Sequence, residues 1–275
     1  MTAPKRVIRL IALDLDGTLL DRQGQLSPAD AAALRQQQQR GVLVVLASGR
    51  MTDSIRKVAA ALGLNGPIIA YNGARVTDGQ ARSGRILLHR PLPARYADEL
   101  IAYAKEQRFH LNYYLEEVLY GVDTPELRPF ADLYTRQTGS QFCFVDDLER
   151  FRGCAPTKII LITEPPRRDE LYRFWQEKWG QKVWVTTTNP EYLEFLHKEA
   201  SKGAALEVIA REYGIPQQET MAFGDGRNDI PMLQWAGLGV AVANAESECK
   251  QAADYVSAFT NDESAVARAI AELAE

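Results

Sequence analysis

Short apolar runs alternate with helical patterns along the first part of this chain, and this alternation limits the fold more than any other feature. Residues 7–13, 41–47 and 67–71 are mainly apolar runs of strand length, and helical patterns at 27–40 and 52–62 separate them. Strands of a parallel sheet that are buried on both faces have this composition. Right-handed crossovers then place the helices on the two faces of the sheet. The sequence predicts an α/β fold with a doubly wound, mostly parallel, Rossmann-like sheet.

The same texture returns near the C-terminus after a different middle region. A helix is expected at 202–213, a strand at 220–223 and a terminal strand near 238–242. Between 85 and 194 the chain is richer in aromatic residues and in hairpin patterns. The expected elements there are a hairpin of 111–114 with 118–122, a strand at 158–163, a helix at 169–179 and a pair of strands at 183–187 and 192–196. We therefore expect an inserted α+β domain at 85–194 within a core made of 1–84 and 195–275.

Composition excludes several classes of function. The 275 residues carry a formal net charge of −4 and no run of Lys or Arg, so nucleic acid is not an expected partner. No window approaches the roughly 18 apolar residues that span a bilayer, so no membrane partner is expected. Three scattered cysteines without a CxxC pattern fit a reducing cytoplasmic location. Nothing in the sequence indicates the oligomeric state.

Four polar clusters follow apolar strands or begin helices. Ligands of open α/β sheets bind beyond the carboxyl ends of the strands, so these clusters are expected to meet there. They are Asp14 with Asp16, Ser48 with Gly49, Lys202 with Gly203, and Asp225 with Asn228 and Asp229.

This combination suits the chemistry of phosphate esters. Converging aspartates form a hard oxygen site for Mg²⁺, which also takes an oxygen of a substrate phosphate. Lys202 and Ser48, with main-chain N–H groups near Leu15 and Gly49, are able to surround the phosphate itself. We expect a Mg²⁺-dependent enzyme whose partner is a small phosphorylated metabolite.

The two aspartates near the N-terminus suit different steps. Asp14 is the candidate nucleophile, which would form an aspartyl-phosphate and divide one difficult displacement into two. Asp16 is the candidate general acid and base, brought to the leaving-group side by a sharp turn at Gly17. Its carboxyl must then stay protonated at neutral pH, and a lid that excludes water would favour this. Each cluster alone also fits an ordinary turn or helix cap; their joint occurrence carries the argument.

Taken together, these motifs resemble the haloacid dehalogenase-like phosphatase superfamily. Its DxDGT signature is found at 14–18, its strand-end Ser or Thr in LASGR at 46–50, its lysine in SKG at 201–203 and its acidic motif in GDGRND at 224–229. The YNGA sequence at 71–74 and the position of the insertion resemble the Cof-type branch, in which 85–194 would be an α/β cap domain.

The resemblance implies a role for each matching residue. It implies metal binding by Asp14, the main-chain carbonyl of Asp16 and Asp225, with Asp229 as direct or outer support. It also implies a phosphate site formed by the Leu15 amide, Ser48, Gly49, Lys202 and Asn228.

Other polar and aromatic residues are expected to have no catalytic role. The isolated His89, His110 and His197 are predicted to be packing or surface residues, and Arg227 a surface residue. Arg50 is predicted either to reach the edge of the site or to pair with a core carboxylate. The aromatic residues of the insertion are predicted mainly to pack within it: Tyr113, Tyr114, Trp175, Trp179 and Trp184.

The sequence leaves alternatives open for the reaction. A phosphomutase of the same fold would share the chemistry and return the phosphate to its substrate. A receiver-like, non-hydrolytic module would use a similar acidic pocket, but it has no need of a large insertion, which is better explained as a lid. Among substrates we expect sugar phosphates first, followed by nucleotide, flavin or pyridoxal phosphates.

Overall fold

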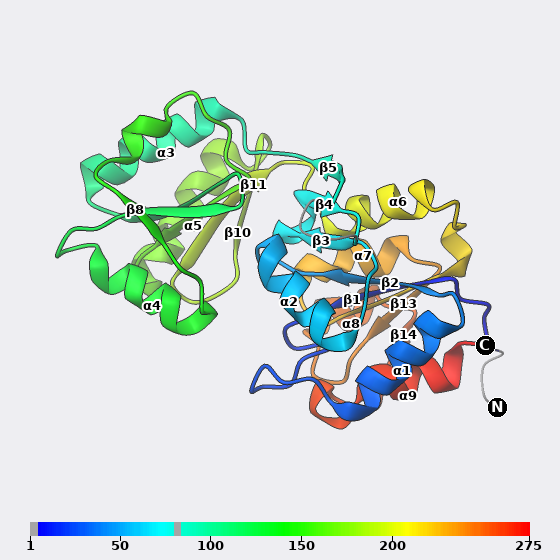
Figure 1. Cartoon of the computed structure of the whole chain (residues 1–275). Helices are drawn as coiled ribbons and strands as arrows, with labels where there is room; N and C mark the ends of the chain where they lie inside the picture. The colour runs from blue at the N-terminus through cyan, green and yellow to red at the C-terminus, as the bar shows by residue number, and fades with distance from the viewer. Residues whose placement is uncertain (1–4, 80–83) are drawn as a thin grey trace. The chain divides into compact units, whose positions relative to one another are not determined.

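The computed structural model describes residues 5–79 and 84–275, and the chain divides into two compact units (Figure 1). Unit 1 combines Met1–His89 with Ser201–Glu275, and unit 2 is Arg90–Ala200. The division expected from the sequence lay at 84/85 and 194/195. Residues 1–4 and 80–83 of the expected core lie outside the described residues. The catalytic role of unit 1 and the cap role of unit 2 remain predictions.

Unit 1 contains a mostly parallel sheet, which confirms the prediction from the sequence. Among the described residues it has eight strands in the order β14-β13-β12-β1-β2-β3-β4-β5, with β4 and β5 running antiparallel to their neighbours. Its strands are β1 (Leu10–Asp14), β2 (Leu43–Ala47), β3 (Ile68–Ala70), β4 (Arg75–Thr77), β5 (Ile86–His89), β12 (Thr220–Gly224), β13 (Leu238–Ala241) and β14 (Tyr255–Val256).

Helices cover both faces of this sheet (Figure 1). They are α1 (Pro28–Gln39), α2 (Thr52–Leu62), α6 (Lys202–Glu212), α7 (Ile230–Trp235), α8 (Ser247–Ala252) and α9 (Ala265–Leu273). Helix α1 begins as the sequence predicts, because the Ser27 side chain accepts a hydrogen bond from the Asp30 amide at 3.0 Å. Alternate side chains of β1, including Leu10 and Ala12, pack with residues of α6 and α7.

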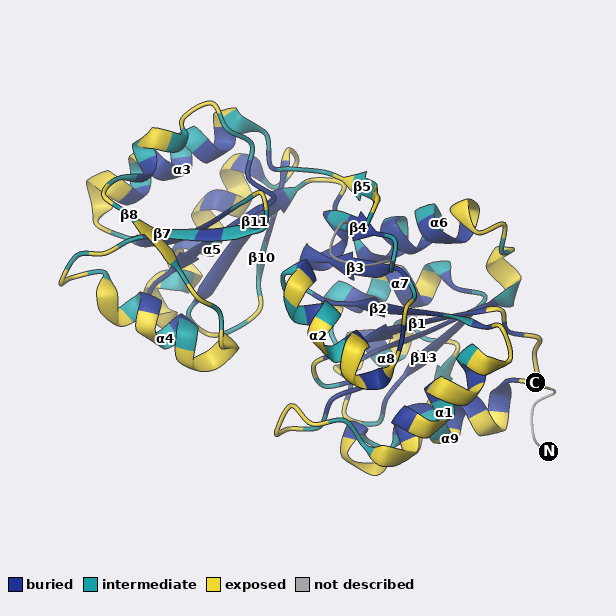
Figure 2. Ribbon diagram, viewed as in Figure 1, coloured by how far each residue is buried: buried dark blue, intermediate teal, exposed yellow. Residues whose placement is uncertain are grey.

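The centre of the sheet positions the polar clusters. Strand β1 lies between β2 and β12 in parallel register, and its side chains are buried from end to end (Figure 2). The three strands therefore end at the same edge of the sheet. Asp14 is the last residue of β1, Ser48 follows β2 and Asp225 follows β12. This is the edge at which α/β proteins bind ligands.

Unit 2 is built on a mixed sheet with the order β10-β11-β9-β6-β7-β8. The strands are β6 (His110–Leu115), β7 (Val118–Val122), β8 (Cys143–Val145), β9 (Lys158–Ile162), β10 (Val183–Thr187) and β11 (Tyr192–His197). The helices are α3 (Ala94–Gln107), α4 (Arg128–Thr138) and α5 (Pro165–Trp179). Both predicted strand pairs, β6 with β7 and β10 with β11, are confirmed as antiparallel.

Aromatic side chains fill the core of unit 2. Trp175 and Trp179 of α5 pack against each other with ring centroids 4.3 Å apart, and both contact Phe195 of β11. Tyr113 and Tyr114 are buried as well, and Trp184 is half-buried. The predicted packing role of these aromatic residues agrees with this placement. Over the described ranges, no helix combines the length and the apolar character needed to cross a membrane.

Candidate active site

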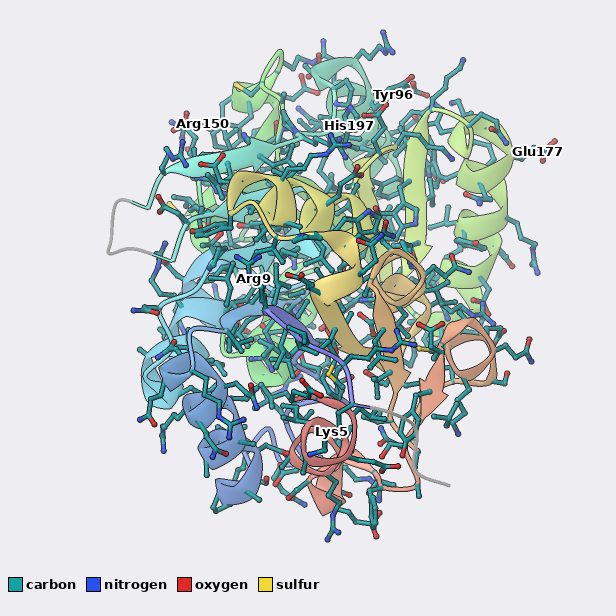
Figure 3. All side chains as sticks on the ribbon, turned by 90° about the vertical axis from the view of Figure 1, so that its right-hand side faces the viewer. Lys5, Arg9, Tyr96, Arg150, Glu177 and His197 are labelled. Carbon is teal, nitrogen blue, oxygen red and sulfur yellow. The ribbon has the colours of Figure 1, made fainter. Side chains whose placement is uncertain are left out.

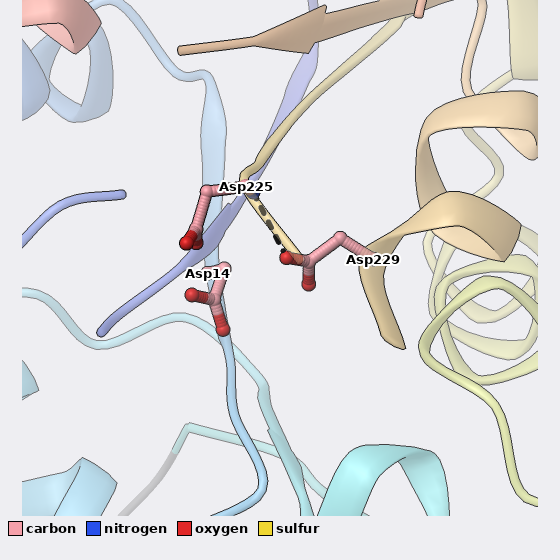
Figure 4. A group of neighbouring side chains, drawn as sticks. All are labelled: Asp14, Asp225 and Asp229. Carbon is pink, nitrogen blue, oxygen red and sulfur yellow. Dashed lines mark hydrogen bonds between the residues drawn. The ribbon is translucent and has the colours of Figure 1, made fainter. Parts of the chain in front are cut away.

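Three carboxylates meet at the carboxyl edge of the sheet in unit 1. Asp14 ends β1, Asp225 follows β12, and Asp229 closes the short 3-10 turn Arg227–Asp229 (Figure 4). Each offers an oxygen atom, and these atoms lie within 4.8 Å of one another. Asp14 and Asp229 are buried, with 5% and 1% of their surface exposed. Segments more than 200 residues apart in the chain therefore form one acidic centre.

Lys202, at the start of α6, is the cation of this centre. Its Nζ donates to Oδ1 of Asp14 and, at 2.6 Å, to Oδ1 of Asp229. The side chain is fully buried. Burial alone lowers the pKa of Lys202, but the carboxylates of Asp14 and Asp229 outweigh burial and raise it. A lysine in the first turn of a helix opposes the helix dipole, and these two carboxylates explain its position.

Asp229 has both of its oxygens engaged. Oδ1 accepts from Lys202, and Oδ2 accepts from the main-chain N–H groups of Asp225 and Gly226, each at 3.0 Å. A Cβ at Gly224 would lie only 2.4 Å from the Cβ of Asp229, so this close approach requires glycine. Asp229 thus orders the loop that carries Asp225 and orients the lysine.

The carboxylates of this centre outnumber its lysine, which pairs with two of them. Burial and the nearby Asp229 raise the pKa of Asp14 well above its ordinary value, although Lys202 opposes this. Burial is also the largest cause that raises the pKa of Asp225, to about 6. Thr18 Oγ1 donates to Asp225 at 2.7 Å. Three carboxylates share one lysine, so the donor set fits a hard divalent cation such as Mg²⁺.

Asp16 lies outside this carboxylate group. Its side chain is 56% exposed and forms a two-point ion pair with Arg50, in which Nε donates to Oδ2 at 2.8 Å and Nη2 donates to Oδ1. Arg50 therefore pairs with a carboxylate at the edge of the site. Gly17 makes the turn between Asp16 and Thr18 with φ of +84°, and a Cβ there would lie 2.4 Å from Asp225 Oδ2.

The residues predicted to hold phosphate lie in the loops that follow β1, β2 and β12 and at the start of α6. Ser48 is buried, and its Oγ accepts from the Arg50 amide at 3.2 Å. Leu15 is fully buried directly after Asp14. Asn228 Nδ2 donates to Oδ1 of Asn72 at 3.0 Å. Gly49 lies against the same asparagine, because a Cβ at Gly49 would be 3.0 Å from Asn72 Oδ1.

Sequence reasoning missed three polar residues beside the site. Thr18 contacts Asp225, Asn72 contacts Asn228, and Asn244 Nδ2 donates to the Gly17 carbonyl at 2.7 Å. Thr18 and Asn72 belong to motifs at 14–18 and 71–74 that were recognised without a role for these side chains. Asn244 lies in a loop after β13 with no motif to mark it.

Arg227, His197 and His110 have surface or packing positions, as the sequence predicts. Arg227 is an exposed residue, with 72% of its side chain accessible, and pairs with Glu246 and Glu248. His197 ends β11 in unit 2 (Figure 3), where its Nδ1 accepts from the Glu199 amide at 3.1 Å. His110 is buried in unit 2 beside Asn112. The carboxylate group found among the described residues includes no histidine.

Comparisons with known proteins point to one family. A family model described as haloacid dehalogenase-like hydrolase matches residues 11–270. Phosphatase YwpJ of Bacillus subtilis is 30% identical over 303 residues, which cover 97% of this chain and all of that protein. The 5-amino-6-(5-phospho-D-ribitylamino)uracil phosphatase YcsE of the same organism is 29% identical, with 96% and 94% covered. The crystal structure of TM0651 from Thermotoga maritima is similar at 32% identity and a TM-score of 0.86, with 98% of each chain covered.

Proposed function

Because this chain belongs to the haloacid dehalogenase-like hydrolases, as a Cof-type phosphatase acting on phosphoric monoesters, we propose that it hydrolyses small sugar phosphates through an aspartyl-phosphate at Asp14 with Mg²⁺ as cofactor. One observation carries the proposal beyond the family: three converging carboxylates share a single buried lysine. That excess of negative charge is costly unless a cation binds. A phosphate ester then becomes an acceptable ligand for an acidic site.

The metal ligands are assigned by which oxygens the protein already uses. Asp14 and Asp225 would hold Mg²⁺, together with the main-chain carbonyl of Asp16. Asp229 supports them from outside, since Lys202 and two main-chain amides occupy its oxygens. When bound, the ion supplies positive charge that offsets the substrate phosphate and the carboxylates.

Asp14 is the proposed nucleophile. Lys202 fixes one of its oxygens, which orients the carboxylate so that the other can be presented to phosphorus. A bond forms between Asp14 and phosphorus while the bond from phosphorus to the ester oxygen breaks. The alcohol departs with a proton from Asp16. Water then attacks the aspartyl-phosphate, Asp16 takes a proton from that water, and inorganic phosphate and the free Asp14 carboxylate result.

Asp16 must change partner to perform this task. Its carboxylate is exposed and therefore open to a leaving group, but both of its oxygens contact Arg50. We therefore assign the acid and base role to Asp16 in a state in which the contact with Arg50 has opened.

The remaining residues would bind the transferred group. The Ser48 hydroxyl, the amides of Leu15 and Gly49 and the Asn228 side chain supply donors, and Lys202 supplies charge. These donors come from the loops after β1, β2 and β12. Donors held in place by separate loops stabilise developing charge without reorganising during the reaction.

A panel of phosphate esters tests the proposal. It should contain sugar phosphates, a ribitylamino-pyrimidine phosphate of the kind named for the relative YcsE, and nucleotide, flavin and pyridoxal phosphates. The wild-type protein should release phosphate with Mg²⁺, and Asp14→Asn should not. Equal release by the two proteins would contradict the hydrolase proposal. An isomerised sugar phosphate without net phosphate release would show a phosphomutase instead.

A further inference from the structure

The turn after β3 has an unusual backbone. Tyr71 and Asn72 both have positive φ angles, 50° and 55°, in the 3-10 turn Tyr71–Gly73. Non-glycine residues seldom adopt this region, although asparagine does so more readily than most. The Tyr71 amide donates to the Arg50 carbonyl at 3.1 Å and the Asn72 amide to the Ser48 carbonyl at 3.0 Å. The turn is therefore fastened to the loop that follows β2.

The same turn lies against the start of α6. A Cβ at Gly73 would be 2.1 Å from the Ser201 carbonyl oxygen and 2.9 Å from the Lys202 nitrogen. The φ of Gly73 is also positive, at 96°. Only glycine fits this position, so the backbone of the turn and the backbone before the buried lysine are in direct contact.

The side chain of Asn72 connects to a third loop. Its Oδ1 accepts from Asn228 Nδ2 at 3.0 Å. Asn72 follows β3 and Asn228 follows β12, and the sheet places β1 and β2 between these two strands. The hydrogen bond thus connects the loops on either side of the two strands that carry Asp14 and Ser48. Gly49 leaves room for it, since a Cβ there would lie 3.1 Å from Asn72 Nδ2.

One polar atom of Asn72 has no protein partner. The residue is 1% exposed, and within 5–79 and 84–275 no acceptor meets its Nδ2. A buried amide donor without a partner costs free energy. The Ser48–Gly49 loop and Asn228, which are proposed to hold phosphate, contact Asn72, and the neighbouring Gly73 lies against the main chain of Lys202.

From this arrangement we propose that Asn72 is a further phosphate-binding residue, whose Nδ2 donates to an oxygen of the bound anion while its Oδ1 holds Asn228 in place. The inference rests on the proposed function. A neutral donor suits this position because it adds a hydrogen bond to the phosphate without changing the charge balance of three carboxylates, one lysine and one divalent cation. The hydrogen bond to the phosphate also gives the buried Nδ2 an acceptor.

Two substitutions distinguish the donor role of Asn72 Nδ2 from the contact of its Oδ1 with Asn228. Asn72→Gly removes the whole side chain while its backbone accepts a positive φ without strain. Asn72→Asp keeps an oxygen for Asn228 but removes the Nδ2 donor and adds negative charge. Hydrogen bonds to charged groups contribute about 1.5–3 kcal/mol, which corresponds to roughly 10- to 100-fold in affinity. We expect Asn72→Gly to weaken binding of inorganic phosphate by about 10-fold or more, and Asn72→Asp to weaken it further.

The measurement is the affinity for inorganic phosphate with Mg²⁺ present, by calorimetry and as a product-inhibition constant, together with kcat and KM. Ser264→Gly is the matched control, because Ser264 lies in the same unit with φ of 59° and contacts Ser27 outside the site. It should bind phosphate as the wild type does. Thermal unfolding of each variant identifies any general loss of structure.

Several outcomes would overturn the inference. Wild-type phosphate affinity in both Asn72 variants would show that the side chain does not bind the anion. Weaker binding in Asn72→Gly with wild-type binding in Asn72→Asp would disprove the Nδ2 donor. Either result would disprove only the role of Asn72, and hydrolysis of esters by the wild-type protein would still support the proposed function. If the wild type neither binds phosphate nor releases it, both proposals are wrong.

Discussion

Each unit of the molecule buries a lysine among acidic side chains, but the charge is balanced in only one of them. In unit 2, Lys158 Nζ lies 3.2 Å from Glu194 Oε2, and both side chains are 4% exposed. Glu194 Oε1 also accepts from Thr188 at 2.5 Å. In unit 1, Lys202 pairs with Asp14 and Asp229, and Asp225 adds a third carboxylate to the same group.

The difference separates a structural pair from the proposed binding site. One lysine paired with one glutamate, with a further hydrogen bond from Thr188, balances its own charge. Burial, together with the neighbouring Asp229, raises the pKa of Asp14 and Asp225, so their charged forms are costly without a metal ion. The number of carboxylates per buried lysine therefore indicates function here better than the burial of the lysine does.

The largest expected effect comes from neutralising one anion in each cluster. Asp14→Asn should reduce phosphate release by about 10³-fold or more, because the proposed nucleophile is lost. Glu194→Gln makes the same chemical change in the balanced pair, and kcat with a small ester should stay within a few-fold of the wild-type value. Steady-state phosphate release measures both. Equal losses in the two variants would remove the distinction between the clusters.

Removing each lysine tests the comparison through stability. Lys158→Met leaves Glu194 buried without its cation and should lower the free energy of unfolding by about 3–5 kcal/mol, with catalysis largely intact. Lys202→Met leaves three carboxylates together and should destabilise the metal-free protein at least as much, while also abolishing turnover. Calorimetric unfolding with EDTA and an activity assay with Mg²⁺ distinguish them. An active Lys202→Met protein would contradict the proposed site.

The acidic centre should also respond to pH and to metal in a defined direction. The pKa of Asp225 is raised from 3.8 to about 6. The stability that the protonated Asp225 carboxyl contributes is therefore fully present below pH 3.8 and is lost as the pH rises through 6. At pH 8 without metal, Asp225→Asn should therefore be more stable than the wild type by on the order of 2 kcal/mol. Mg²⁺ should raise the Tm of the wild type only. Thermal unfolding with EDTA or Mg²⁺ checks this, and a Mg²⁺-dependent shift in Asp225→Asn would argue against the metal site.

The smallest effect is expected in unit 2. Burial lowers the pKa of His110 from 6.5 to about 4. A neutral buried histidine contributes stability above pH 6.5, and this contribution is lost as the pH falls towards 4. Between pH 7 and 5.5 the loss should be about 1 kcal/mol. Unfolding of the wild type and of His110→Phe over this range measures it, and identical pH profiles would show that His110 does not contribute.

The parts of the fold that could be predicted are those with strong local signals. Continuous apolar strands, the Ser27 cap and the helix over Thr52–Leu62 were readable because their signals lie within a few residues. The strands β4 and β5 and the helices α3 and α4 were not specified. The two strands are short and extend one edge of the sheet, where β4 runs antiparallel to β3 and β5 runs antiparallel to β4. Neither strand was predicted from a local pattern.

In the candidate site, residue types were easier to predict than their partners. The motifs identified Asp14, Lys202 and Asp225 because each follows a strand or begins a helix at a known point of the sheet. The pairing of Asp16 with Arg50 and the contact of Asn72 with Asn228 depend on loop conformation and on pairing across the sheet. Positive φ at two consecutive non-glycine residues has no signature that a single sequence makes visible.

The most direct test of the account is to identify the atom that receives the phosphoryl group. A single turnover with a labelled ester and Mg²⁺, quenched in acid and mapped by mass spectrometry of peptides, should show a labile phosphoryl group on Asp14 that forms before inorganic phosphate appears. The label should be absent from Asp14→Asn and unaffected in amount by Glu194→Gln. Phosphate release without a phosphoryl group on Asp14, or with the label on another residue, would contradict the account.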